Sequence, residues 1–159
     1  MEKTTPKIYV LVGVPGSGKT TWLRQQAFDW TTTVHIGTDK LIEQHAASTG
    51  QKYRDVFKSY MPRAVTMMTN EVRRAFDADL DVVWDQTNVT VEARKRRLRM
   101  VPVHYTKIAV VFRTPPAGVH ARWLDRPGKE IPAWFIDSMI AQFEKPELKE
   151  GFDEIVYIN

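Results

Sequence analysis

The sequence predicts an α/β domain built on a mostly parallel sheet of five strands flanked by helices. Short apolar runs rich in β-branched residues alternate along the chain with segments whose apolar residues recur every three or four positions. The first apolar run leads at once into a glycine-rich turn and a helical segment. Hydrophobic residues make up 43% and charged residues 26% of the 159 residues, so we expect one globular domain covering residues 1–159.

Five short segments have the composition of strands. Each is rich in apolar or β-branched residues and is bounded by polar or glycine-containing turns. The first is apolar from Ile8 to Val12, which indicates a strand covered on both faces, as in a parallel sheet. We expect the strands at Lys7–Val12, Thr33–Ile36, Asp81–Trp84, Tyr105–Phe112 and Glu154–Ile158.

The segments between these strands have helical patterns. In one of them Val65, Met68 and Val72 fall three or four positions apart, and we place its start at Pro62 because proline suits a first helical turn. Thr90 has a side chain that can cap a helix N-terminus. The expected helices are Thr20–Phe28, Asp39–Ala47, Pro62–Ala78, one after Thr90, one around Ala117–Leu124 and one from Pro132.

The stretch Ile8–Thr21 carries the pattern G-x-x-x-x-G-K-[ST], which ends in Gly18, Lys19 and Thr20. Glycines allow a tight loop to turn its backbone N–H groups inward around anionic oxygens, and a helix after the loop points the positive end of its dipole at the same oxygens. Lys19 would reach the β- and γ-phosphates, and the Thr20 hydroxyl would hold Mg²⁺. The pattern therefore predicts a nucleoside triphosphate site.

The composition excludes several other kinds of site. Cysteine is absent, so disulfides and thiolate metal sites are impossible. No run is apolar enough to span a membrane and no signal-peptide core is evident, so we expect a cytoplasmic protein, in the host cytoplasm if a phage encodes it.

Lysine and arginine exceed aspartate and glutamate by 23 to 19, a modest bias toward polyanionic partners. The oligomeric state cannot be predicted from these features.

Two acidic residues follow predicted strands at the sheet edge where α/β folds bind ligands. Asp39 comes after the second strand and Asp85 directly after the third. Beside a triphosphate, two carboxylates suggest phosphoryl transfer to an alcohol, with one accepting the hydroxyl proton and the other orienting the acceptor or its magnesium. Alternatively, Asp39 caps a helix and Asp85 coordinates a metal-bound water.

Two groups of cations complete the candidate residues. Arg122 and Arg126 stand four apart before a Pro-Gly break, in a segment of about 122–131 that we interpret as a small lid. Such arginines could neutralise charge on the transferred group or simply face solvent. Residues 94–99 hold five cations in six positions, which could form a solvated helix or contact nucleic-acid phosphates.

Four segments in order resemble the kinase domain of phage polynucleotide kinase/phosphatase and its cellular relatives. They are the phosphate loop at 13–22, I-G-T-D at 36–39, D-Q-T-N at 85–88 with the basic helix after it, and R-W-L-D-R-P-G-K-E-I-P at 122–132. The loop is generic, whereas the ordered set is more specific and covers most of the chain. The resemblance implies a P-loop kinase fold with strand order 2-3-1-4-5, and ATP-dependent phosphorylation of a nucleic-acid hydroxyl.

The resemblance also implies roles for individual residues. Asp39 would be the general base, Lys19 and Arg126 would stabilise the transferred phosphoryl group, and Thr20 would hold Mg²⁺. Asp85 would act on the acceptor side of the site. The residues expected to hold ATP are Gly13, Pro15, Gly16, Ser17, Gly18, Lys19, Thr20, Thr21, Arg122 and Arg126.

One position departs from the polynucleotide kinases. They usually have an arginine three residues after the catalytic aspartate, where it holds the acceptor's phosphate, and this chain has Ile42. An aliphatic side chain cannot make those bidentate contacts. Either Lys40 or the basic helix takes over, or the acceptor is not a 5′ terminus. The chain is also similar to phage kinases that phosphorylate 5-hydroxymethyluracil within DNA, a hydroxyl that would be flipped out of the duplex.

The sequence therefore predicts an ATP- and Mg²⁺-dependent kinase acting on a hydroxyl of nucleic acid, DNA before RNA. A 5′-terminal hydroxyl and the hydroxymethyl group of a base are both open as acceptors. A kinase of a small molecule such as a sugar, nucleoside or antibiotic is an alternative, as is a triphosphate-binding switch or ATPase module. The sequence does not distinguish ATP from GTP.

Overall fold

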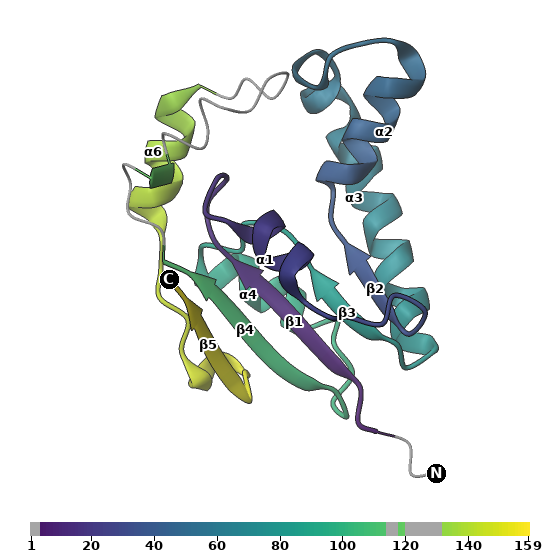
Figure 1. The fold of residues 1–159 in the computed structure, drawn as a ribbon, viewed down its shortest axis with the longest axis vertical. Helices are drawn as coiled ribbons and strands as arrows, with labels where there is room; N and C mark the ends of the chain where they lie inside the picture. Colours follow the sequence, from purple (N-terminus) through teal and green to yellow (C-terminus); the bar gives the residue numbers. More distant parts are fainter. Residues whose placement is uncertain (1–3, 114–117, 120–131) are drawn as a thin grey trace.

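The strands form one parallel sheet in the computed structural model, which describes residues 4–113, 118–119 and 132–159 (Figure 1). Their order is β2-β3-β1-β4-β5, and every neighbouring pair is parallel. The predicted five-stranded parallel sheet is confirmed, and the order is the one that the resemblance implies. The strands are β1 (Lys7–Val12), β2 (Thr33–Ile36), β3 (Asp81–Trp84), β4 (Thr106–Phe112) and β5 (Glu154–Ile158).

Helices connect the strands at the predicted places, with some shifted ends. Thr90 accepts a hydrogen bond from the backbone N–H of Ala93 at 3.1 Å, so it caps α4 as expected. The helix after the phosphate loop ends at Gln25, short of Phe28, whose ring packs on Tyr9 of β1. The helix expected around 117–124 falls almost wholly outside the described residues. The described helices are α1 (Lys19–Gln25), α2 (Asp39–Thr49), α3 (Tyr53–Asp77), α4 (Val91–Leu98), α6 (Ala133–Gln142) and the short 3₁₀ turn η1 (Leu148–Glu150).

The predicted start of a helix at Pro62 is wrong. Helix α3 begins at Tyr53 and runs through Pro62 without a break. Proline lacks the N–H that would bond to the carbonyl four residues back, but Pro62 is exposed, so water can reach the group left over. On the opposite side Val56 and Ala64 stay buried, and their packing holds the helix together across the proline.

The two faces of the sheet are covered by different helices. Alternate residues of β1 point to opposite faces, so Val10 joins the core that α2 and α3 cover. Leu11 joins a second cluster with Trp22 of α1. Because both faces are buried, the strands read as continuous apolar runs.

The cores also position the elements around the carboxyl ends of the strands. The α2–α3 pair and α6 extend beyond this edge on opposite sides of it (Figure 1). Ile136 of α6 is completely buried in a third apolar cluster with Val14 of the phosphate loop and Val89 of the loop after β3. This cluster holds α6 beside the place where the predicted site residues converge.

Candidate active site

The loop between β1 and α1 has the backbone that its glycines predict. Gly16 and Gly18 have φ angles of 81° and 101°, in the left-handed region that favours glycine. A Cβ on Gly13 would lie 2.4 Å from the Ser17 Oγ, so the first glycine is needed for close packing. The loop is therefore a tight cradle of backbone, which is the form that phosphate oxygens require.

Lys19 and Thr20 lie at the mouth of this cradle. The Lys19 ammonium donates hydrogen bonds to the backbone oxygens of Gly13, at 2.5 Å, and Val14, at 3.5 Å. It therefore lies across the loop, where it can exchange a backbone oxygen for a phosphate oxygen. Thr20 is exposed at the start of α1. These positions fit a triphosphate with a magnesium ion, which prefers few protein ligands together with phosphate oxygens.

The loop after β3 is hydrogen-bonded to β1 and the phosphate loop. The backbone N–H of Gly13 donates to the Thr87 oxygen at 2.9 Å, and the Asn88 amide donates to the Leu11 oxygen at 2.9 Å. Asn88 is buried and has a φ of 47°, a conformation that asparagine tolerates better than most residues. The Thr87 backbone and the Asn88 side chain thus shape the donor side of the site.

One cavity of about 290 Å³ joins the phosphate loop to the two predicted carboxylates. Lys19, Thr20, Asp39 and Asp85 all line it, so the structure brings together residues that are up to 66 positions apart (85 − 19). Thr21 is exposed and does not line it, while Arg122 and Arg126 lie outside the described residues. The lining residues are Pro15, Gly16, Lys19, Thr20, Thr38, Asp39, Tyr53, Phe57, Met61, Asp85, Gln86, Thr87, Phe135 and Met139.

Asp39 is the first residue of α2, and a tyrosine holds its carboxylate. The Tyr53 hydroxyl, at the start of α3, donates a hydrogen bond to Asp39 Oδ1. Asp39 itself is exposed to the cavity, whereas Tyr53 is buried. The pair gives the carboxylate a defined orientation, as a general base needs.

Asp85 is held beside Asp39 by contacts between the loops after β2 and β3. The Asp85 backbone N–H donates to the Ile36 backbone oxygen at 2.6 Å. The two loops also pack closely at Gly37, where an added Cβ would lie only 2.6 Å from the Asp85 backbone oxygen. His35 Nε2 lies 2.9 Å from Asp85 Oδ2. The histidine thus orients the second carboxylate, a contact that sequence reasoning missed because it depends on the pairing of β2 with β3.

Part of the cavity wall is apolar and aromatic, with side chains from two helices. Tyr53, Phe57 and Met61 come from α3, and Phe135 and Met139 come from α6. Sequence reasoning did not identify these residues, because their spacing is that of ordinary core residues. A flat ring would find apolar contacts on both sides of this space.

Neither Lys40 nor the basic helix at residues 94–99, the two candidates to replace the missing arginine, lines the cavity. Ile42 is completely buried in the core. Lys40 donates to the Glu71 carboxylate at 3.1 Å and to the His35 backbone oxygen. Among the residues that the structure describes, Lys19 is the only basic side chain lining the cavity.

Two arginines of the basic helix α4 pack against the rest of the protein. Arg94 is completely buried and pairs with both carboxylate oxygens of Glu150, at 2.8 and 3.2 Å. The Arg97 guanidinium lies over the Trp84 ring, 5.4 Å from its centroid, and burial lowers its pKa, with the Arg96 charge adding to the shift. Arg94 is therefore not available to nucleic acid, and Arg97 is partly buried against Trp84.

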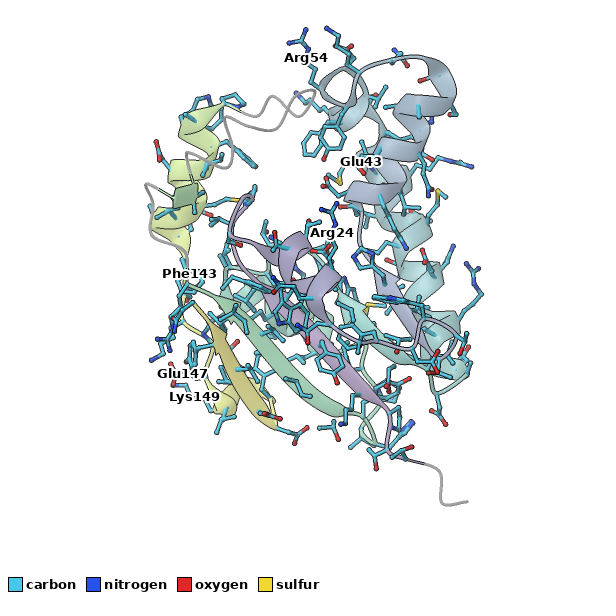
Figure 2. All side chains as sticks on the ribbon, viewed as in Figure 1. Arg24, Glu43, Arg54, Phe143, Glu147 and Lys149 are labelled. Carbon is cyan, nitrogen blue, oxygen red and sulfur yellow. The ribbon has the colours of Figure 1, made fainter. Side chains whose placement is uncertain are left out.

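A second hollow of about 200 Å³ lies beside the phosphate loop. Gly13 and Ser17 line it together with Phe112 of β4 and with Phe143, which lies at the C-terminal end of α6 (Figure 2). The Arg113 side chain, which also lines it, stacks on the Tyr157 ring at 3.8 Å. Two of the predicted nucleotide-binding residues thus face this hollow rather than the main cavity.

The comparisons with known proteins agree with this geometry. The model of the AAA domain family AAA_33 matches residues 8–146, which include every described residue of the phosphate loop and both carboxylates. The chain belongs to this family of P-loop kinases. The described residues hold no cluster of three or more acidic or histidine side chains that could bind a metal. Magnesium does not need such a cluster, because it is usually bound by one or two protein ligands together with the substrate's phosphates.

Individual relatives are distant. A curated relative, the heterogeneous nuclear ribonucleoprotein U-like protein 2 of Mus musculus, is 24% identical over 161 residues; the match covers 95% of this chain and 21% of that protein. The Pnkp1 part of an RNA repair complex with Rnl and Hen1 is similar in structure, with a TM-score of 0.68, 22% identity, and coverage of 89% of this chain and 45% of that chain. A gluconokinase of Sinorhizobium meliloti 1021 has a TM-score of 0.58, 18% identity, and coverage of 98% and 83%.

These likenesses identify the fold and not the acceptor, because a P-loop kinase fold serves several acceptors. The chain spans about a fifth of the curated relative and under half of the RNA repair protein. In the part of the chain that the structure describes, no helix is long and apolar enough to cross a membrane.

Proposed function

We propose that this protein is an ATP- and Mg²⁺-dependent kinase that phosphorylates a hydroxyl group on DNA, namely the hydroxymethyl group of a modified base such as 5-hydroxymethyluracil. The observation that carries the proposal is the single cavity in which the phosphate loop faces Asp39 and an aromatic wall. The loop supplies the donor side and the wall supplies a place for a flat ring. Asp39 lines the same cavity.

Each residue has a role in the transfer. The phosphate loop and Lys19 hold the β- and γ-phosphates, and the Thr20 hydroxyl would hold a Mg²⁺ ion, which would supply charge neutralisation of the phosphates. Asp39 accepts the proton of the acceptor hydroxyl as its oxygen bonds to the γ-phosphorus. The bond from that phosphorus to the bridging oxygen breaks, and ADP leaves. Asp85, oriented by His35, positions the acceptor.

The nucleoside end of ATP would occupy the second hollow. Gly13, Val14 and Ser17 of the phosphate loop line this hollow, so it adjoins the same loop as the main cavity. Its apolar lining, with Phe112 and Phe143, suits a purine ring. Arg122 and Arg126 stay predictions for the transferred phosphoryl group, since they lie outside the described residues.

Two observations favour a base hydroxyl over a 5′ terminus. A 5′-terminal nucleotide brings a phosphate next to the reacting hydroxyl, and the described cavity offers no arginine for it because Ile42 is buried and Lys40 is paired with Glu71. A flipped base brings an uncharged ring instead. Stacking on aromatic side chains such as Phe57 and Phe135 stabilises such a base by about 1–3 kcal/mol.

The test uses γ-labelled ATP and two duplexes. One duplex carries 5′-hydroxyl ends, and the other has blocked ends and internal 5-hydroxymethyluracil. We expect label on the second duplex, and Asp39→Asn should lower the rate by about 10²- to 10⁴-fold because the general base is lost. Label on the first duplex alone would favour a 5′-terminal hydroxyl as the acceptor. No label on either would refute a nucleic-acid acceptor.

A small-molecule kinase is the second candidate, and the cavity itself favours it. Its volume of about 290 Å³ is close to that of pockets for small ligands. The gluconokinase likeness adds that the same fold is found in a kinase of a metabolite. This candidate predicts phosphorylation of a free nucleoside or sugar, and no salt-dependent affinity for DNA.

A further inference from the structure

Gln86 is a polar residue of the cavity that the proposed chemistry does not use. It lies between Asp85 and Thr87 in the loop after β3, and all three line the cavity. Its Oε1 accepts a hydrogen bond from the indole N–H of Trp84 at 3.2 Å. Trp84 is completely buried, and Arg97 covers its ring. The donor to Gln86 is therefore held rigidly.

This hydrogen bond determines which way the Gln86 amide faces. An amide oxygen and nitrogen are hard to tell apart by shape, but an indole N–H can only donate. The oxygen must therefore face Trp84, and the NH₂ group must point away from it. No acceptor for this NH₂ group is found among the described residues, and the nitrogen is not enclosed by protein. Since Gln86 lines the cavity, its NH₂ group is available to donate to a ligand bound there.

We infer that Gln86 recognises the acceptor by donating to a carbonyl oxygen of its ring, an inference that rests on the proposed function. The loops after β2 and β3 touch at Gly37, so Gln86 and Asp39 lie on neighbouring loops of one cavity. In 5-hydroxymethyluracil the hydroxymethyl group and the C4 carbonyl stand on adjacent ring carbons. One base can therefore place its hydroxyl at Asp39 and its carbonyl at Gln86.

The inference makes the site selective between two related bases. In 5-hydroxymethylcytosine an amino group replaces the C4 carbonyl, and it would set donor against donor at Gln86. A site that must leave a polar group unpaired rejects such an analogue. Trp84 is a positioning residue in this scheme, since it acts through Gln86.

The experiment measures kcat/KM on two end-blocked duplexes, one with a single internal 5-hydroxymethyluracil and one with 5-hydroxymethylcytosine. Wild type should prefer the uracil by about 10- to 100-fold. In Gln86→Glu one oxygen still accepts from Trp84, while the other can only accept at the cavity, so the preference should fall at least about tenfold. Gln44→Glu makes the same charge change at an exposed site on α2 and should leave the preference unchanged.

The ratio of the two substrates separates recognition from general damage, because an added charge or a loss of folded protein lowers both rates together. Gln86→Met has no donor at this position. Its kcat/KM should therefore fall on the 5-hydroxymethyluracil duplex and stay unchanged on the 5-hydroxymethylcytosine duplex, so the preference is lost. An unchanged ratio in both variants, with an active wild type, overturns the inference and leaves the proposed function standing. No label from wild type on either base overturns the proposed function and this inference with it.

Discussion

Replacing Tyr53 with phenylalanine tests whether Asp39 is the general base. The variant removes one hydroxyl, the one that donates to Asp39 Oδ1. The ring should keep its place, because it is buried and contacts Phe57 at a centroid distance of 5.5 Å. The change therefore affects the orientation of the carboxylate with little effect on the core.

The expected loss follows from the hydrogen bond. A bond to a charged group stabilises by about 1.5–3 kcal/mol. If this energy holds the Asp39 carboxylate in its reactive orientation, kcat falls about 10- to 150-fold, since 1.36 kcal/mol is a factor of ten. The KM for ATP should not change, because Lys19 and the phosphate loop are untouched.

The assay is steady-state transfer of labelled phosphate, with two comparisons. Tyr60→Phe on the same helix removes a hydroxyl that, among the described residues, donates to the Met67 sulfur at 3.4 Å, and this variant should leave kcat unchanged. In an enzyme that already carries Asp39→Asn, adding Tyr53→Phe should cost little more, because the two residues act through one contact. A Tyr53→Phe enzyme within twofold of wild type, or a full additional loss on top of Asp39→Asn, would refute the reasoning.

Two further predictions concern the fold that supports the site. Arg94→Met should lower the free energy of unfolding in urea by about 3–5 kcal/mol, because it leaves the Glu150 carboxylate buried without its partner. The double variant with Glu150→Gln should recover part of the loss, and equal losses in both would contradict the pairing. Burial, with help from Asp79 and Asp81, raises the pKa of Tyr105 to about 12 from an ordinary 10.0. The folded state then keeps a proton that the unfolded state releases, so stability should fall between pH 10 and pH 12, and less steeply in Tyr105→Phe; equal slopes would contradict the shift.

The donor side of the site could be predicted from the sequence because it is local. Gly16 and Gly18 adopt the left-handed backbone that their place in the motif requires, and Lys19 follows them directly. Asp39 and Asp85 could be predicted as well, because the carboxyl ends of parallel strands share one edge. The alternation of strands and helices was enough to predict the parallel sheet.

The acceptor side could not be predicted in the same way. Phe57 and Phe135 lie on helices far apart in the sequence, and each has the helical spacing of a core residue. Which of them faces the cavity depends on how α3 and α6 pack. Pro62 shows a similar limit, since its position at a helix start or in a helix interior depends on the apolar contacts of the preceding turns.

The sequence by itself determined that a triphosphate loop, two carboxylates and a parallel sheet belong together, because these features depend on residue types at short spacings. Only the tertiary structure decided what surrounds them. It places Ile42 in the core, pairs Lys40 with Glu71 and bonds the Gln86 amide oxygen to the Trp84 indole. Such outcomes depend on contacts between segments distant in the chain, and short-range patterns do not encode them.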